Sequence, residues 1–432
     1  MTELFVWREI FGSYELVGVL REGHAGLEFS YTVEYLDDPH SKAVSRAFPL
    51  QDAPFGQKET SAFFGGLLPE GSLRNALAIT ARTSTKDVGA LLARLSNESS
   101  GALVFTVDRE FPAHGMSYES VGLEVLQDFC NAPREVSLSL NMRSRLSLAG
   151  AQSKVGLHHE GDDLSTGWYI PMGSAPSTFI LKAEEGAFPG LAYNEAICMS
   201  AARSLGFDVP GFALLDVGGE APLFIVERYD RLRDDSRAFP RRLHQEDFCQ
   251  ALGINPELKY EPTGAGYPEL GSWLLARESD NPFGDKVCFF ESILFDALIG
   301  NCDNHLKNYS LLYGDDWSSA EMAPLYDLVC TTLYPTLDAE MGVSLCPSRK
   351  VQDTTWSSIE SHAAAARLPI DLITSDFLGM ADELPGALEA AGDRLTALGF
   401  PAAKEVSREI IENRADTIER LTREAKGRGL SL

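Results

Sequence analysis

A change of pattern near residue 300 constrains the fold of this chain more than any other feature. The segment FFESILFDALIG, residues 289–300, is apolar at helical spacing, and the next eight positions, NCDNHLKN, hold six polar or charged side chains. This change predicts a core helix that ends in a polar loop. Because functional residues concentrate on loops held by rigid elements, we expect chemistry at this loop.

The spacing of acids and amides in this region indicates phosphoryl transfer. Asp303 and Asn308 have the Asp-x-x-x-x-Asn spacing, and Asp327 follows in the segment PLYDL. Kinases use one Asp as the base for the attacking hydroxyl, and an Asn and a second Asp as magnesium ligands. The alternative is a helix end whose Asp and Asn side chains cap main-chain groups. Because the motif is short, both interpretations stay open on this evidence alone.

Composition places the chain among globular proteins with two or three domains. It has 432 residues, 44% of them hydrophobic and 23% charged, with a formal net charge of −26. Such an acidic chain repels phosphate backbones and anionic lipids, so a sequence-independent nucleic-acid or membrane-surface function is not expected.

Cysteine and histidine usage indicates a reduced compartment and no metal centre built on these residues. The seven cysteines form no C-x-x-C pair, which predicts reduced core thiols. His158 and His159 adjoin three acids in a Gly-containing segment, which we interpret as a solvated hairpin tip. With no targeting segment and no apolar run near the roughly 18 residues that cross a bilayer, we expect a cytoplasmic protein without membrane contact.

The first 130 residues predict a small α+β domain. Short β-like runs (LFVWREI, YELVGVL, EFSYTVEYL) precede helical patterns at LRNALAITAR and VGALLARLS. FFGGLLPEG, residues 63–71, contains three glycines and a proline, which predicts a structural loop. Residues 131–146 are polar, contain a proline and show no clear helical stripe, so we place a domain boundary there.

Residues 131–242 predict a β-rich lobe. Two β-like runs flank SLAGAQSK, where the Gly150-Ala151 main chain could approach a phosphate beside Lys154. Lys182 ends the strand FILK, and we expect an amphipathic helix to open at Asn194-Glu195, as in kinases where a strand Lys is paired with a helix Glu. A common hairpin and a snorkelling strand-end Lys are the alternatives.

The strand pair GFALLDVGG and PLFIVERYDR leads to a segment where a kinase passes into its helical lobe. Glu227 and Tyr229 lie where an adenine ring meets main-chain groups in such enzymes. Arg228, Asp230 and Arg231 equally suit surface ion pairs of little energetic value. From about residue 243 the periodicity is helical, ending in a long amphipathic helix from about 402 to 426. This division gives domains at 1–130, 131–242 and 243–432.

Taken together, these motifs resemble the HipA family of bacterial toxin–antitoxin serine/threonine kinases over nearly the full length. The resemblance rests on seven motifs in the same order: SLAGAQSK (147–154), the strand Lys182, Asn194-Glu195, ERYDR (227–231), HQEDFCQALG (244–253), GNCDNHLKN (300–308) and PLYD (324–327). It implies an α+β, two-lobed protein-kinase-like fold with an N-terminal α+β subdomain, a β-rich ATP-binding lobe and a helical C-terminal lobe.

The resemblance also implies roles for individual residues. Asp303 would be the catalytic base, and Asn308 and Asp327 would hold Mg²⁺. Ser147 matches the family's autophosphorylated serine, although an ordinary hairpin serine is the alternative. ATP would be bound by residues from several segments, namely Ala149, Gly150, Ala151, Gln152, Ser153, Lys154, Lys182, Glu227, Tyr229, His305, Lys307 and Tyr326.

The resemblance implies two partners: a helix-turn-helix antitoxin dimer and a protein substrate, for which an aminoacyl-tRNA synthetase is the candidate. With the strongly negative charge, we expect DNA contact only through the antitoxin. Two other functions remain open: a small-molecule kinase on the same fold, and a non-catalytic ATP-binding partner of a DNA-binding antitoxin.

Overall fold

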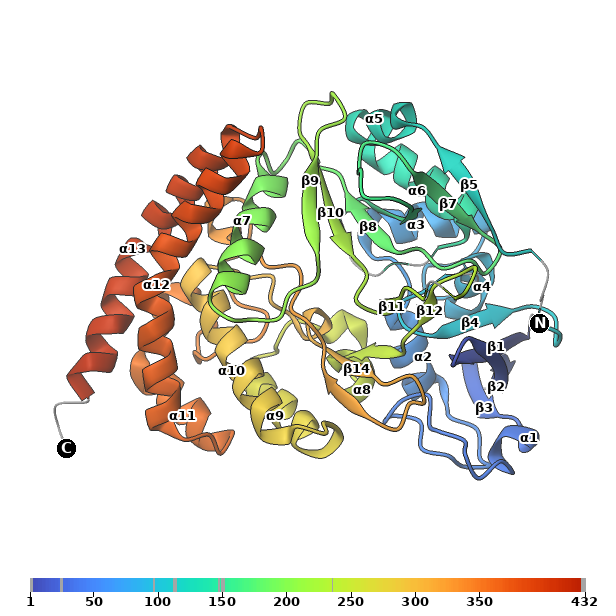
Figure 1. Cartoon of the computed structure of the whole chain (residues 1–432). Helices are drawn as coiled ribbons and strands as arrows, with labels where there is room; N and C mark the ends of the chain where they lie inside the picture. Colours follow the sequence, from blue (N-terminus) through green and yellow to red (C-terminus); the bar gives the residue numbers. More distant parts are fainter. Residues whose placement is uncertain are drawn as a thin grey trace. The chain divides into compact units, whose positions relative to one another are not determined.

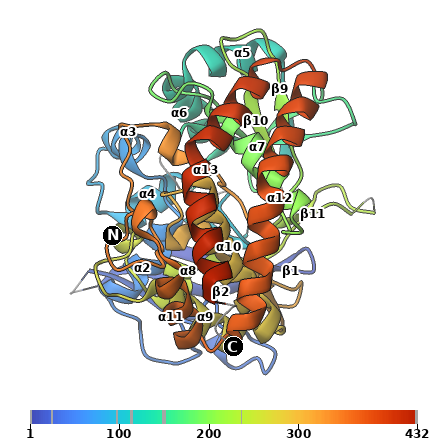
Figure 2. The ribbon, with the colours of Figure 1, turned by 90° about the vertical axis from the view of Figure 1, so that its left-hand side faces the viewer.

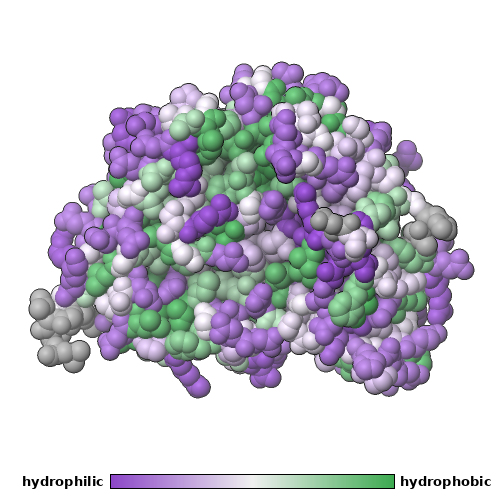
Figure 3. Space-filling model, viewed as in Figure 1, coloured by the Kyte–Doolittle hydropathy of each residue, from purple (hydrophilic) through white to green (hydrophobic). Residues whose placement is uncertain are grey.

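The computed structural model describes residues 3–23, 26–95, 98–111, 115–146, 148, 152–234 and 236–428. The chain forms two compact units, each built from separate stretches of sequence. The first unit comprises residues 1–185, 212–256 and 310–320, and the second comprises residues 186–211, 257–309 and 321–432. Hydrophilic side chains are spread over the face drawn in Figure 3, as expected when 23% of residues are charged.

The first unit begins with a four-stranded antiparallel sheet in the order β3-β2-β1-β4. Phe11 and Gly12 join β1 to β2 with φ of 47° and 76°, the pair of left-handed residues that a two-residue hairpin turn requires. Helices α1 to α4 accompany this sheet (Figure 1). The elements are β1 (Leu4–Ile10), β2 (Ser13–Gly23), β3 (Gly26–Tyr31), α1 (Val33–Leu36), α2 (Gln57–Gly66), α3 (Gly71–Ala81), α4 (Val88–Arg94) and β4 (Leu103–Thr106).

Aromatic side chains fill the core of this first part. The expected loop over residues 63–71 is partly wrong, because its first four residues are the end of α2. Phe63 and Phe64 are fully buried and pack edge to face with Phe48 and Phe105. Burial of these large rings favours the helix over the loop that the glycines indicated.

A six-stranded antiparallel sheet, in the order β5-β7-β6-β8-β10-β9, forms the rest of the first unit. Helices α5 and α6 pack on it (Figure 1) through a shared apolar core. Short elements follow the sheet. The elements are β5 (Ser117–Val121), α5 (Leu123–Asn131), α6 (Pro133–Ser144), β6 (Lys154–His159), β7 (Trp168–Met172), β8 (Phe179–Lys182), β9 (Phe212–Leu215), β10 (Leu223–Glu227), β11 (Arg231–Leu232), β12 (Arg241–Arg242), β13 (Gln245–Asp247), α8 (Phe248–Leu252) and β14 (Ser310–Tyr313).

Residues 131–146 show no clear helical stripe in the sequence, yet most of them form helix α6. Its buried positions include Ser137, Asn141 and Ser144, so the buried face is polar and gives no apolar stripe. The amide nitrogen Nδ2 of Asn141 donates to the main-chain oxygen of Lys154 at 2.9 Å. The proline at the first helical position suits a helix start.

The second unit is mainly helical. Helices α12 and α13 run side by side in both views (Figure 1, Figure 2), and α7 packs against them. All seven cysteines are free thiols, as expected. In the described residues, no helix combines the length and apolar character needed to cross a bilayer. The elements are α7 (Leu191–Ser204), η1 (Pro256–Leu258), which begins where the chain enters this unit, α9 (Tyr267–Glu278), α10 (Pro282–Ile299), η2 (Leu306–Asn308), β15 (Ala320–Met322), η3 (Thr331–Leu333), η4 (Val351–Asp353), α11 (Trp356–Ala365), α12 (Ile370–Ala397) and α13 (Ala402–Arg428).

Candidate active site

The polar loop predicted after the apolar helix follows directly on α10. The helix ends at Gly300, whose φ of 74° is left-handed and suits glycine. From α13, the buried Arg414 donates hydrogen bonds of 2.9 Å to the main-chain oxygens of Leu298 and Ala297. These carbonyls are among those that a helix end leaves without a helical partner. The start of the loop is therefore held by a capped helix.

Asp303 is fixed through its main chain while its carboxylate stays accessible. Its N–H donates to Oδ1 of Asn301 at 3.1 Å. Its carbonyl accepts from the N–H of His305 and from Nδ2 of Asn308, each at 2.8 Å. The side chain is 58% exposed, and its Oδ1 accepts a hydrogen bond from the hydroxyl of Tyr260. An accessible carboxylate on a fixed main chain suits a base that must reach a substrate.

A buried carboxyl group that we did not predict is bonded to this loop. Asp296 on α10 is 2% exposed, and it accepts hydrogen bonds from Nδ2 of Asn301 (2.9 Å) and from the hydroxyl of Tyr309 (2.8 Å). Burial raises the pKa of Asp296 to about 7. Because Asn301 also accepts from the N–H of Asp303, these bonds connect the buried acid to the candidate base. The sequence signal for this site was Asp296 itself, an acid inside the apolar run FDALIG, because an acid that is buried there needs hydrogen-bonding partners.

Asp327 lies in a second segment that is bonded to the same loop. Its φ of 55° is left-handed, which is uncommon for a residue other than glycine and often marks a functional position. Its carbonyl accepts from Nδ2 of Asn301 at 3.4 Å, and the hydroxyl of the preceding Tyr326 donates to the main-chain oxygen of Lys307 at 2.7 Å. Within the second unit, the structure therefore brings together the segments that carry Asp303 and Asp327.

Helix α7 helps to hold the segment that follows Asp327. The side chain of Asn194 accepts from the N–H of Cys330 at 2.8 Å and donates to its carbonyl at 3.0 Å. The helix expected to open at Asn194 is present, but α7 opens three residues earlier, at Leu191, and is not amphipathic because it is buried on nearly all sides. Both Asn194 and Glu195 are buried, so polarity in the sequence did not mark a solvent face here.

The side chains around the loop fit a magnesium ion. Asn308 uses its amide nitrogen on the carbonyl of Asp303, which leaves its amide oxygen to serve as a ligand. Carboxylate and amide oxygens are the ligands that magnesium takes in proteins, and Asp327 supplies a carboxylate on the neighbouring segment. Within the described part of the chain, no group of three or more His, Cys, Asp and Glu side chains could hold a metal. A magnesium site here therefore depends on the amide.

The predicted phosphate-binding residues belong to the first unit. Lys154 on β6 lies directly opposite Lys182 on β8 in the antiparallel register. Lys182 is 5% exposed, with its Nζ 5.5 Å from the centre of the Phe224 ring. The hydroxyl of Ser153 donates to Glu185 at 2.7 Å. Gln152 is described and half-buried. Four of the predicted positions, Ser147, Ala149, Gly150 and Ala151, lie outside the described residues.

The predicted adenine-binding segment follows β10. Glu227 is exposed and pairs with Phe179 of β8, and the next N–H, that of Arg228, donates to the carbonyl of Thr178 at 2.9 Å. Tyr229 is half-buried, and its hydroxyl donates to Gln245. Residues 227–229 are therefore held in the first unit by main-chain and side-chain hydrogen bonds.

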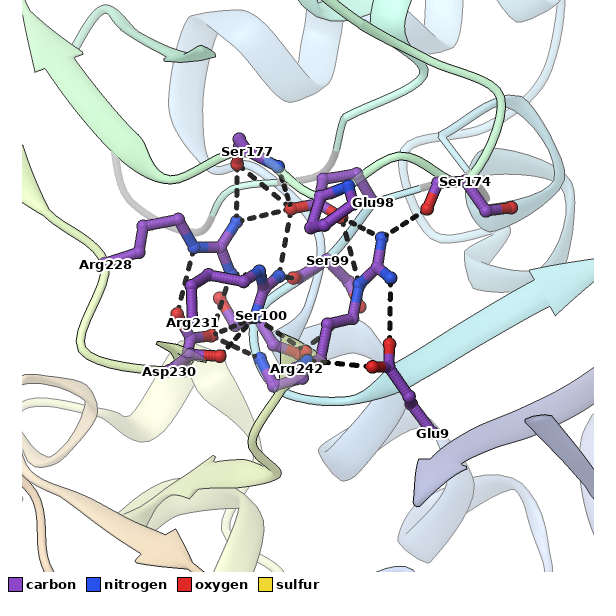
Figure 4. A network of polar contacts seen from close by, with 12 residues as sticks. Glu9, Glu98, Ser99, Ser100, Ser174, Ser177, Arg228, Asp230, Arg231 and Arg242 are labelled. Atoms are coloured by element: carbon purple, nitrogen blue, oxygen red, sulfur yellow. Dashed lines mark hydrogen bonds and ion pairs between the residues drawn. The ribbon is translucent and has the colours of Figure 1, made fainter. Parts of the chain in front are cut away.

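Arg228, Asp230 and Arg231 are buried, so the alternative of surface ion pairs is wrong. Figure 4 shows the carboxylate of Glu98 among three guanidinium groups, at 2.9 Å from Arg228, 2.9 Å from Arg231 and 2.5 Å from Arg242. Asp230 pairs with Arg228 at 2.8 Å and with Arg231 at 2.9 Å. Each of these five side chains is at most 4% exposed.

This Glu98 cluster joins distant parts of the first unit. Burial alone would raise the pKa of Glu98, but the neighbouring guanidinium groups hold it at about 2. Arg242 also pairs with Glu9 of β1 at 3.1 Å and donates to the carbonyl of Ser174 at 2.8 Å. The cluster therefore ties the segment after β10 to the N-terminal sheet.

His158 and His159 are also less exposed than expected. They end strand β6 and are 6% and 2% exposed, whereas we placed them at a solvated hairpin tip. His158 stacks on Tyr118 with ring centres 3.9 Å apart, and His159 packs on Trp168. Burial lowers the pKa of His158 to about 4, so its imidazole is neutral at physiological pH.

Two protein-family models match this chain. The description "HipA-like C-terminal domain" matches residues 146–390, which is more than half of the chain. The description "HipA N-terminal domain" matches residues 9–106.

Individual relatives agree with these matches. A putative kinase, Y4mE, of Sinorhizobium fredii is 33% identical over 376 residues, covering 85% of this chain and 87% of the relative. The serine/threonine-protein kinase toxin HipA of Shewanella oneidensis is 27% identical over 377 residues, covering 83% of each. Among solved structures, HipA in the Shewanella oneidensis complex of HipA, HipB and operator DNA has a TM-score of 0.80 at 22% identity, covering 98% of both chains.

Proposed function

The chain belongs to the HipA family and has its kinase fold, and on that premise we propose that it is an ATP- and Mg²⁺-dependent serine/threonine kinase that acts as the toxin of a toxin–antitoxin pair. Membership of this kinase family implies the use of ATP. The observation that carries the proposal is the loop of the second unit, where Asp303 is exposed on a fixed main chain and Asn308 and Asp327 lie on bonded segments.

In this proposal Asp303 accepts the proton of the attacking hydroxyl, and the oxygens of Asn308 and Asp327 hold magnesium. The metal would neutralise charge on the phosphates while the residues of this chain orient the reactants. Lys182 and the segment 149–154 would bind the phosphates, with His305, Lys307 and Tyr326 contributing to the nucleotide site, and Glu227 and Tyr229 would meet the adenine ring. We propose the same three domains as the sequence indicates, at residues 1–130, 131–242 and 243–432.

Regulation and partners form the second part of the proposal. We propose that Ser147, which matches the family's autophosphorylated serine, is autophosphorylated here. The phosphate would add nearly two negative charges beside a phosphate-binding segment and would therefore repel ATP. The structural relative is bound to HipB and operator DNA, which supports a helix-turn-helix antitoxin as the partner here. A net charge of −26 favours DNA contact through that partner. We further propose a cytoplasmic location and a protein substrate, with an aminoacyl-tRNA synthetase as the first candidate.

Labelled ATP and a single substitution test the proposal. We expect the wild-type chain, with magnesium, to transfer labelled phosphate to itself or to a protein in a cell lysate. Asp303→Gln should abolish the transfer while leaving the melting temperature and ATP affinity close to wild type, because the side chain is 58% exposed and makes few contacts. A variant that labels as fast as wild type would refute the base assignment. Label found only in a metabolite would refute the protein substrate.

A further inference from the structure

Tyr260 makes a contact with the candidate base that the proposed function does not use. Its hydroxyl donates a hydrogen bond to Oδ1 of Asp303, 43 positions along the chain and within the same unit. Tyr260 is 42% exposed and the Asp303 side chain is 58% exposed. A hydrogen bond between two such exposed groups contributes little to folding, which points to a role in the reaction.

The main chain on both sides of Tyr260 is anchored. The polar loop of residues 301–308, here called the candidate loop, contains Leu306, whose N–H donates to the carbonyl of Lys259 at 3.1 Å. The N–H of Glu261 donates to the carbonyl of Gly342 at 2.8 Å, and the buried Glu261 carboxylate accepts main-chain N–H groups at the start of α9. The position of Tyr260 over the loop is therefore set by the fold.

The ring and the hydroxyl of Tyr260 have separate contacts. The ring meets His305 edge to face, with centres 5.1 Å apart and an angle of 86°, and the Lys259 ammonium lies 5.2 Å from the ring centre. Replacing Tyr260 with Phe keeps these ring contacts and removes only the hydroxyl. The chain thus allows a clean test of the hydrogen bond.

We propose that Tyr260 is a positioning residue for the phosphoryl transfer, and this inference rests on the proposed role of Asp303. The hydroxyl of Tyr260 donates a hydrogen bond to Oδ1 of Asp303, and Nε2 of His305 lies 3.9 Å from the same oxygen. With Oδ1 bonded to Tyr260, Oδ2 would be the oxygen that takes the proton of the incoming hydroxyl. That hydroxyl oxygen bonds to the γ-phosphorus, the bond from the γ-phosphorus to the β–γ bridging oxygen breaks, ADP leaves, and the hydroxyl proton passes to Oδ2.

The test compares Tyr260→Phe with a matched control. In the full-length chain, we expect Tyr260→Phe to lower kcat for transfer from labelled ATP to the chain itself and to dephosphorylated casein by about tenfold, which is the loss typical of one charge-assisted hydrogen bond. The KM for ATP, ATP affinity by calorimetry and the melting temperature should stay near wild type. Tyr14→Phe also removes a hydroxyl bonded to a carboxylate, that of Glu9 at 3.1 Å, and should leave kcat unchanged.

The outcomes separate this inference from the proposed function. A Tyr260→Phe kcat within twofold of wild type, or higher than wild type, refutes positioning by the hydroxyl. Equal losses in kcat, ATP affinity and melting temperature indicate a structural role only and also refute it. A wild-type chain that binds ATP but transfers no phosphate overturns the proposed function itself, and the role of Tyr260 falls with it.

Discussion

The carboxylates of Asp303 and Glu98 illustrate two opposite uses of charge in this chain. The Asp303 side chain is 58% exposed on a loop whose main chain is fixed by Asn301 and Asn308. Glu98 is fully buried among three arginines that fix the segment after β10. The first arrangement keeps a carboxylate available to a substrate, whereas the second uses charge to join parts of the fold.

The difference between these two regions teaches that a local polar sequence does not show whether its carboxylate is exposed or buried. Partners that are distant in the sequence decide this. In the candidate loop, Asn301, Asp303 and Asn308 are bonded to one another within a few residues, so their spacing is informative. In the Glu98 cluster, the three arginines lie 130 to 144 positions from Glu98 in the sequence, so no local pattern reveals that they pair with it.

The largest expected effect on stability is at Glu98. Glu98→Gln removes the charge that three buried guanidinium groups share, and an unpaired buried charge costs about 3–5 kcal/mol. We expect the free energy of unfolding, measured with urea, to fall by that amount, whereas Asp303→Gln should leave it nearly unchanged. A loss below about 1 kcal/mol would show that the remaining acids, Asp230 and Glu9, compensate for Glu98.

Gly342 lies on a segment next to the candidate loop, and Gly342→Ala would strain the main chain of that loop. A Cβ at Gly342 would lie 2.8 Å from the N and Cα of His305, and main-chain atoms cannot yield cheaply. We expect a stability loss of about 2 kcal/mol and a fall in kcat of at least about tenfold, because displaced catalytic groups react slowly. Gly379→Ala in α12, where a Cβ would meet nothing within 4 Å, is the control. It should leave kcat near wild type and raise the stability by about 0.5–1 kcal/mol, because alanine favours a helix interior more than glycine does. Equal effects at both positions would contradict the steric argument.

The family, the fold class and the kinase assignment were predictable from the sequence, and the comparisons confirm them. The loop after α10 was recognisable because helix, glycine and polar side chains follow one another locally. Helix α6 was not, since its buried face holds Ser137 and Asn141 in place of an apolar stripe. The roles given to the individual site residues remain predictions.

Asp296 gives the candidate loop a pH dependence that the Glu98 cluster does not share. Because burial raises its folded pKa to about 7, above the unfolded value near 4, its contribution to stability is present below pH 4 and is lost as pH rises to about 7. We expect the difference in unfolding free energy between wild type and Asp296→Asn to change by about 1 kcal/mol per pH unit between pH 5 and 7. A difference that is constant with pH would contradict a buried, protonated Asp296.

The smallest expected effect is at an exposed ion pair, which repeats the Glu98 change without burial. Glu119 pairs with Arg143 on α6, and the two side chains are 47% and 49% exposed. Water and salt screen such a pair, so Glu119→Gln should change the unfolding free energy by less than about 0.5 kcal/mol in the urea assay used for Glu98→Gln. Since both substitutions convert a glutamate paired with arginine to glutamine, burial is the variable that separates them. A loss at Glu119 as large as that at Glu98 would show that exposure does not decide which ion pairs hold this fold together.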